Sequence, residues 1–172
     1  HQMWVAQHMK FNSPKNHLSS GGAGTMGFGL PAAIGVQVAR PDDFVITVSG
    51  DGSIMMNIQE LATIRRNNLP VKILVIDNQR LGMVRQWQQM FFEERYSETI
   101  LSDNPDFVAL AAVFGIKGQA ITKASEVDDA VQALVDSKGP YILHACIDEQ
   151  ENVWPLVPPG AANDQMVTEV KK

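Results

Sequence analysis

The sequence contains a single cysteine, Cys146, among its 172 residues. One cysteine excludes a disulfide within the chain and a zinc site built from several thiolates, and it favours a reducing, cytoplasmic location. Cys146 lies in the apolar run 141–147. We therefore expect a buried structural thiol rather than a nucleophile.

Long apolar runs and an excess of positive charge are also missing. The longest apolar run, residues 107–116, is far shorter than the roughly 20 residues that a membrane-spanning helix needs. The chain has 14 Lys and Arg against 19 Asp and Glu, which gives a formal net charge of −5. We therefore expect no membrane segment and no nucleic-acid interface, which would require clustered basic side chains.

The first ten residues, HQMWVAQHMK, lack both the basic start and the apolar core of a signal peptide, and they do not begin with Met. We interpret the chain as part of a longer protein. Its length favours one α/β domain over residues 1–150. Residues 151–172 carry several prolines and predict an irregular carboxyl-terminal arm.

Short apolar runs alternate with helical patterns along the chain. The patterns predict an extended piece at 17–20, strands at 44–49, 71–76 and 141–147, and helices at 30–40, from 53 to about 67, at 83–94, at 107–114 and from Ser125 with a capping acid at Asp128. Strands separated by helices predict a mostly parallel sheet with helices on both faces. We expect the strand at 44–49 to be buried on both faces.

Unusual polar and glycine residues occur at three predicted strand ends: the glycine-rich stretch 21–29, the turn 50–53 and the segment 77–80. In an open α/β sheet, ligands bind beyond the carboxyl ends of the strands. The three segments are therefore expected to converge on one ligand site.

Asp51 indicates a metal-bridged diphosphate. Glycines on both sides let a phosphate approach the backbone, and the following helix start suits an anion. A carboxylate beside phosphates is repulsive unless a cation lies between them. Asn78 offers a neutral oxygen after the next strand, and with the Arg80 backbone carbonyl it would complete a protein ligand set for Mg²⁺.

A dinucleotide-binding module is the alternative of a different class. Residues 22–27 fit the G-x-G-x-x-G pattern, and Asp51 follows roughly where an acid that binds ribose belongs. This alternative does not explain Gly52 or the polar segment 77–80. Metal dependence of binding would separate the two interpretations.

Several longer motifs carry a more specific resemblance. These are HQMW at 1–4, SGGAGTMGFGLPAAIG at 20–35, GDGSIMMNIQELATI at 50–64, LPVKILVIDNQRLGMVRQWQ at 69–88 and VPPGAAN at 157–163. Together they resemble the carboxyl-terminal, thiamine diphosphate-binding domain of the large catalytic subunit of acetohydroxyacid synthase (acetolactate synthase), in its bacterial form. The resemblance runs over essentially the whole chain and implies the diphosphate-binding α/β fold of that family.

The resemblance implies a role for individual residues. Asp51, Asn78 and the Arg80 carbonyl would hold magnesium, while His1, Gly52 and Ser53 would contact the diphosphate. The Gly24 carbonyl would accept a hydrogen bond from the aminopyrimidine, Met26 would lie beneath the bent cofactor and Met83 would line its pocket. Trp87 would lie at the second-substrate site, where the family associates it with preference for 2-ketobutyrate. Residues 157–163 would belong to an arm that closes over the site.

The resemblance also implies an activity and partners. The family decarboxylates pyruvate and joins the two-carbon unit to a second 2-keto acid, pyruvate or 2-ketobutyrate, in branched-chain amino acid biosynthesis. Its activating glutamate lies in the amino-terminal, pyrimidine-binding domain of a second catalytic subunit, and a central domain binds FAD. No segment here resembles either domain, so we expect no catalytic residue in this chain and no activity from it alone. A small regulatory subunit is the further partner expected.

The sequence leaves two points open: the exact enzyme and the order of two segments. Another thiamine diphosphate decarboxylase or carboligase, using glyoxylate or sulfoacetaldehyde, would share many of these motifs. Residues 80–105 and the arm after Asp148 mix charges, prolines and apolar side chains, so they are expected to need other domains for their order.

Overall fold

The computed structural model describes residues 1–169, so the last three residues of the predicted arm, 170–172, lie outside the described residues. Its four strands form one sheet in the order β1-β2-β4-β3, and every neighbouring pair is parallel. The strands are β1 (Ile46–Gly50), β2 (Lys72–Asp77), β3 (Lys117–Ile121) and β4 (Tyr141–Cys146). The predicted α/β class with a parallel sheet is confirmed.

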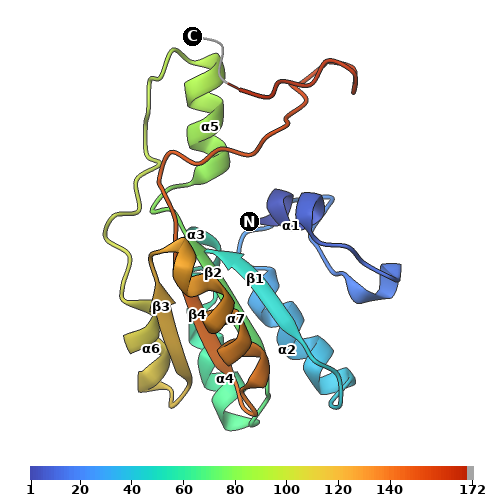
Figure 1. Ribbon diagram of the computed structural model, residues 1–172, viewed down its shortest axis with the longest axis vertical. Coiled ribbons are helices and arrows are strands. Elements are labelled where there is room, and N and C mark those ends of the chain that lie inside the picture. Colours follow the sequence, from blue (N-terminus) through green and yellow to red (C-terminus); the bar gives the residue numbers. More distant parts are fainter. Residues whose placement is uncertain (170–172) are drawn as a thin grey trace.

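Helices α1 and α2 precede the first strand, and the other helices lie in the connections between strands. The α-helices are α1 (Gln2–His8), α2 (Gly29–Ala39), α3 (Asp51–Ile54), α4 (Leu61–Arg66), α5 (Gly82–Phe91), α6 (Phe107–Val113) and α7 (Val127–Asp136). Short 3₁₀ turns are η1 (Pro14–Asn16), η2 (Ile58–Glu60) and η3 (Ala124–Glu126). Figure 1 shows α7 in front of the sheet and α4 behind it.

The core has two parts, one on each face of the sheet. Alternate side chains of a strand point to opposite faces, so Ile73 and Val75 of β2 pack on one side with residues of α2, α3, α4 and α6. On the other side, Leu143 of β4 packs with Ala130 and Leu134 of α7. Helices therefore cover both faces, as predicted.

Three local predictions need correction. The helix expected to run to residue 67 is three short elements, α3, η2 and α4. β1 is an edge strand with Ile46 39% exposed, so it is not buried on both faces. The acid that caps the start of η3 is Glu126, not Asp128, because its carboxylate accepts hydrogen bonds from the N–H groups of Thr122 and Lys123, each at 3.0 Å.

Strand β3 was not predicted. Its sequence, KGQAI, has neither a β-branched run nor a clear alternation, and it lies at the far edge of the sheet. Backbone pairing with β4 holds it, and a Cβ on Gly118 would lie 2.2 Å from Ile142 Cγ2. This close approach requires glycine at position 118.

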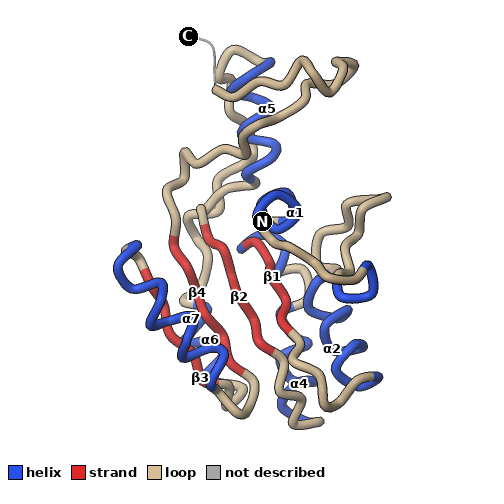
Figure 2. Tube along the Cα trace, turned by 45° about the vertical axis from the view of Figure 1, so that its right-hand side comes forward, coloured by secondary structure: helices blue, strands red, loops and turns tan. Residues whose placement is uncertain are grey.

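Helix α5 projects beyond the carboxyl ends of the strands, and the arm runs beside it (Figures 1 and 2). The arm is joined to α5 by the side chain of Gln86, which is 4% exposed and bonds both the N–H and the C=O of Val153 at 2.9 Å. The apolar side chains of Met83, Trp87 and Phe91 stay exposed on α5. Among the described residues, none of the helices has the length and apolar character needed to cross a membrane.

Candidate functional site

A cavity of about 800 Å³ opens at the carboxyl ends of β1 and β2 and continues along the edge of β1 beside α1 and α2. We call it the carboxyl-edge cavity. The predicted metal and cofactor residues that line it are His1, Gly24, Met26, Asp51, Gly52, Ser53, Asn78, Arg80 and Met83. The expected convergence of the three strand-end segments is therefore present, although it does not by itself assign a role to each residue.

Asp51 is the first residue of α3 and directly follows β1. Its side chain is buried at 3% exposure, and within residues 1–169 no lysine, arginine or histidine side chain forms an ion pair with it. A buried carboxylate without a cationic partner is unfavourable by several kcal/mol. The position is therefore suited to a bound cation.

The glycines on either side of Asp51 allow close packing. A Cβ on Gly50 would lie 2.8 Å from Nδ1 of His1, and a Cβ on Gly52 would lie 3.3 Å from Cε of Met26. Residues 1 and 26 thus lie against the 50–52 turn, although they are distant in sequence. Glycine keeps the backbone N–H groups of this turn accessible to a ligand.

The glycine-rich stretch is fixed against α3 by its last turn. Gly27 has φ +83°, its N–H donates to Oγ of Ser53 at 2.9 Å, and its C=O accepts from Nδ2 of Asn57 at 2.8 Å. Gly24, with φ +62°, lines the cavity. The Ser53 hydroxyl therefore already has a structural partner, while its backbone stays at the helix start.

A polar turn follows β2. The Asn78 side-chain oxygen accepts a hydrogen bond from the Arg80 N–H at 3.2 Å. Arg80 pairs with Ile100 in an antiparallel bridge whose hydrogen bonds are made by residues 79, 81, 99 and 101. In this pattern the C=O of Arg80 itself points away from residue 100. That orientation fits the predicted role of this carbonyl as a ligand, while the Arg80 guanidinium pairs with Glu149.

Asp77, at the end of β2, belongs to a neighbouring buried cluster. Its Oδ2 lies 2.8 Å from Nε2 of His144, and Sγ of Cys146 lies 3.6 Å from the same nitrogen. Two ligands of one tetrahedral zinc ion would lie about 3.3 Å apart at bond lengths of about 2.0–2.1 Å. The Asp77–His144 pair is closer than that, so we interpret it as a hydrogen bond. Cys146 is half-buried, less enclosed than expected.

The pKa values of the two buried carboxylates are shifted in opposite directions. Burial and the neighbouring Asp77 raise the pKa of Asp51 to about 6, against hydrogen bonds from Gly52 and Asn104. Burial would also raise the pKa of Asp77, but hydrogen bonds from His144 and from the N–H of Gln79 lower it below the ordinary value. Asp77 is therefore the more stably ionised acid of the pair, and the charged form of Asp51 is the less stabilised one.

Trp87 stands apart from the other predicted residues. It is 39% exposed on α5, packs edge-on against Phe91 with ring centroids 5.8 Å apart, and does not line the carboxyl-edge cavity. The dinucleotide alternative also lacks a structural basis here. Residues 17–20 are not part of the described sheet, so no paired strand leads into the 22–27 motif.

The sequence analysis missed Asn104, which donates to Oδ2 of Asp51 at 2.8 Å. It also missed Leu81 and Leu101, whose side chains lie 3.1 and 3.0 Å from the place that a Cβ on Gly52 would occupy. Residues 103–105 read only as a break between helices. The Asn-Pro-Asp order could have located the start of α6, because Asp106 caps it through the N–H groups of Val108 and Ala109, but it gives no signal for the contact of Asn104 with Asp51.

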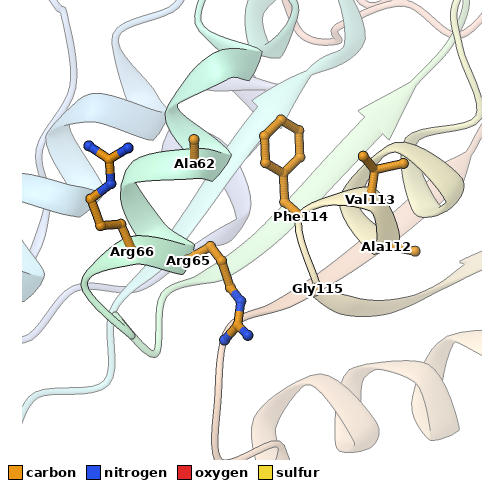
Figure 3. Close-up of a pocket in the computed structure, with 7 residues that line it drawn as sticks. All are labelled: Ala62, Arg65, Arg66, Ala112, Val113, Phe114 and Gly115. Atoms are coloured by element: carbon orange, nitrogen blue, oxygen red, sulfur yellow. The ribbon is translucent and has the colours of Figure 1, made fainter.

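A second, shallow cavity of about 550 Å³ lies between the carboxyl-terminal ends of α4 and α6. Figure 3 shows that it is lined by Arg65 and Arg66 of α4 and by the segment 112–115. Both helices lead into the amino ends of strands, opposite the carboxyl-edge cavity. None of the predicted site residues lines it.

Comparison with known proteins gives consistent matches. The family model "Thiamine pyrophosphate enzyme, C-terminal TPP binding domain" matches residues 1–145. The chain is 64% identical over 167 residues to the acetolactate synthase isozyme 2 large subunit of Escherichia coli (strain K12), covering 97% of this chain and 30% of that protein. It is 52% identical to the acetolactate synthase large subunit of Pyropia yezoensis (97% and 28%) and 46% identical to the chloroplastic acetolactate synthase of Arabidopsis thaliana (98% and 26%). The chain thus spans less than a third of the length of these relatives.

Proposed function

Because this chain belongs to the family of C-terminal TPP-binding domains of thiamine pyrophosphate enzymes, we propose that it anchors thiamine diphosphate through Mg²⁺ as one domain of an acetolactate synthase catalytic subunit. In this proposal residues 1–150 form the diphosphate-binding domain and residues 151–172 form the carboxyl-terminal arm. The observation that carries it is the buried carboxylate of Asp51 in the carboxyl-edge cavity, which Asn78 and Arg80 also line.

The residues present fit the metal and the cofactor. Asp51, the Asn78 amide oxygen and the Arg80 carbonyl are hard oxygen donors of the kind that Mg²⁺ prefers. The cation would supply the positive charge that buried Asp51 lacks. His1, Gly52 and Ser53 would hold the diphosphate, since the glycine turn leaves backbone N–H groups at the start of α3 accessible.

The remaining cavity residues orient the cofactor's organic part. Met26, 42% exposed and in reach of Gly52, would support the cofactor from below, and Met83 would line its pocket. The Gly24 carbonyl would accept a hydrogen bond from the aminopyrimidine. Thiamine diphosphate supplies the electron sink for decarboxylation, while this chain supplies binding and orientation.

The substrates and partners follow from the relatives' names and the resemblance. We propose pyruvate and a second 2-keto acid as substrates, with Trp87 selecting the second one from α5 once other domains close the site. We also propose a second catalytic subunit, FAD in a central domain, a small regulatory subunit and a cytoplasmic location. The activating glutamate would come from another domain, so this chain alone is expected to be inactive.

Thermal unfolding with ligands tests the proposal. The chain is melted with thiamine diphosphate or NAD, each with Mg²⁺ or with EDTA. A ligand that binds the native state alone stabilises it by RT ln(1 + [L]/Kd), about 2.7 kcal/mol at a hundredfold excess over Kd. We expect a rise in Tm with thiamine diphosphate that requires Mg²⁺.

The matched variants are Asp51→Asn, at the buried acid, and Asp103→Asn, at an exposed acid in the loop before α6. Asp51→Asn should remove the Mg²⁺-dependent rise, and Asp103→Asn should keep it. A metal-independent rise with NAD would instead support the dinucleotide alternative. No rise with either ligand would contradict cofactor binding by this chain.

A further inference from the structure

We propose that Asn104 is a positioning residue for the metal site: its side-chain amide lies between the two buried carboxylates and orients Asp51 toward the cation. The inference rests on the proposed function and adds to it a residue outside the strand-end motifs. Nδ2 of Asn104 lies 2.8 Å from Oδ2 of Asp51 and 3.4 Å from Oδ1 of Asp77. Asp51 and Asp77 are 3% and 4% exposed.

The loop that carries Asn104 is held at both ends. Before it, Leu101 N–H donates to the C=O of Gln79 and Leu81 N–H donates to the C=O of Thr99, each at 2.9 Å. After it, Asp106 caps α6 through two hydrogen bonds of 2.9 Å. The position of Asn104 is thus tied both to the turn after β2, which carries Asn78 and Arg80, and to the start of α6.

The same loop also contacts the turn of the metal-binding acid. Cδ1 of Leu101 lies 3.0 Å from the place that a Cβ on Gly52 would occupy. Leu101 therefore packs directly against the residue after Asp51. A change in this loop is transmitted to both proposed metal-ligand turns, 50–53 and 77–80.

The chemistry of the amide suits its place. Asp77 already accepts from His144 on Oδ2 and from the Gln79 N–H on Oδ1. The hydrogen bond from Asn104 uses one acceptor position on Oδ2 of Asp51, so the carboxylate keeps further acceptor positions for a cation. A neutral amide screens the two like charges from each other without neutralising either, whereas a lysine at this place would compete with the metal.

Mn²⁺ binding tests the positioning role of Asn104, because Mn²⁺ takes the same oxygen ligands as Mg²⁺. The concentration of free Mn²⁺ is measured by electron paramagnetic resonance. The chain is titrated with Mn²⁺ at saturating thiamine diphosphate. The variants are Asn104→Ala, Asn104→Leu, which keeps the branched shape of the side chain but loses the donor, and the control Ser102→Ala in an exposed part of the same loop. Circular dichroism establishes which variants are folded.

Removal of a side chain that hydrogen-bonds to a metal ligand typically weakens metal binding by about 10–100-fold. We expect such an increase of the Mn²⁺ Kd in both Asn104 variants, with a changed line shape of the bound ion, and a Kd within about twofold of the original in Ser102→Ala. If Asn104 had only a structural role, its substitution would lower Tm but leave the Mn²⁺ Kd of the folded protein unchanged. That result in Asn104→Leu would overturn the inference about Asn104 without affecting the proposed function. Absence of Mn²⁺ binding in the unsubstituted chain would overturn the proposed function as well.

Discussion

The hydroxyl oxygen of Ser53 accepts a hydrogen bond from the backbone N–H of Gly27 at 2.9 Å. The two residues belong to different motifs, the glycine-rich stretch before α2 and the turn after β1. The bond is buried, so it holds the two walls of the carboxyl-edge cavity in register. It also explains why the side chain of Ser53 faces residue 27, while its backbone lies in the first turn of α3.

Ser53→Ala is expected to destabilise the chain. The substitution leaves the buried N–H of Gly27 without a partner, and an unsatisfied buried donor costs about 1–3 kcal/mol. Urea unfolding measures the loss. Ser102→Ala, at an exposed position, should stay within about 0.5 kcal/mol of the original. A similar stability of both variants would contradict the importance of the Ser53–Gly27 bond.

Gly27→Ala is expected to be more disruptive than alanine at a neighbouring glycine. At φ +83° an alanine is strained, and its Cβ would lie 2.5 Å from Nδ2 of Asn57 and 2.7 Å from Cβ of Met56. Strain of this kind costs about 1–3 kcal/mol before the clash is added. Urea unfolding should show a loss above about 2 kcal/mol.

Gly22→Ala is the matched control for this position. No atom lies within 4 Å of a Cβ built on Gly22. The variant should therefore be neutral, or slightly more stable by about 0.4–1 kcal/mol because alanine restricts the unfolded chain. A loss at Gly22 equal to that at Gly27 would show that the stretch depends on flexibility in general rather than on the turn at residue 27.

The pattern of the sequence was sufficient for strands β1, β2 and β4 and for the place of the cavity. β1 and β2 have β-branched runs, and they are neighbours in the sheet, so Asp51 and Asn78 were expected at one edge. The parallel order alone brings such residues together. Prediction was weaker where local sequence does not decide the structure, as in β3, which pairing with β4 holds at the sheet edge.

Asn104 shows the other limit. Its contact with Asp51 joins residues 53 positions apart. The contact depends on how the loop before α6 is tied to the turn after β2, and no periodicity within the loop encodes that. Trp87 differs from Asn104, because the sequence did predict a role for it, from a motif. In the structure, however, Trp87 lies on the projecting helix α5 and outside the cavity. The proposed role would require other parts of a longer protein to pack against α5.

Cys146 is expected to react slowly with alkylating reagents. Burial, followed by the negative charges of Asp77 and Asp106, raises the pKa of the Cys146 thiol above its ordinary value. The thiolate is the nucleophile, so the native chain should be alkylated by iodoacetamide more slowly than the urea-unfolded chain at pH 8, by about tenfold for each unit of pKa difference.

The pH dependence of the alkylation rate distinguishes a raised thiol pKa from steric shielding of Cys146. A raised pKa moves the increase in alkylation rate to higher pH in the native chain, and the native and unfolded rates then approach each other above that pKa. Because Cys146 is the sole cysteine of the chain, mass spectrometry of the intact protein reads the reaction directly. A native profile with the same midpoint as the unfolded one would show that steric shielding alone controls the rate.

Gln86→Ala is expected to release the carboxyl-terminal arm from α5. The Gln86 amide makes two hydrogen bonds of 2.9 Å with the backbone of Val153, in the manner of a strand partner. Farther along the arm, Leu156 and Val167 pair through two further backbone bonds. Loss of the Gln86 contact should speed amide hydrogen exchange over residues 148–167 while leaving exchange in β2 and β4 unchanged.

Gln132→Ala, on the exposed face of α7, is the matched control and should leave the arm unaffected. Equal exchange in the Gln86 and Gln132 variants would show that other contacts hold the arm, such as those of Asn152 with Arg85 and Gln89 of α5.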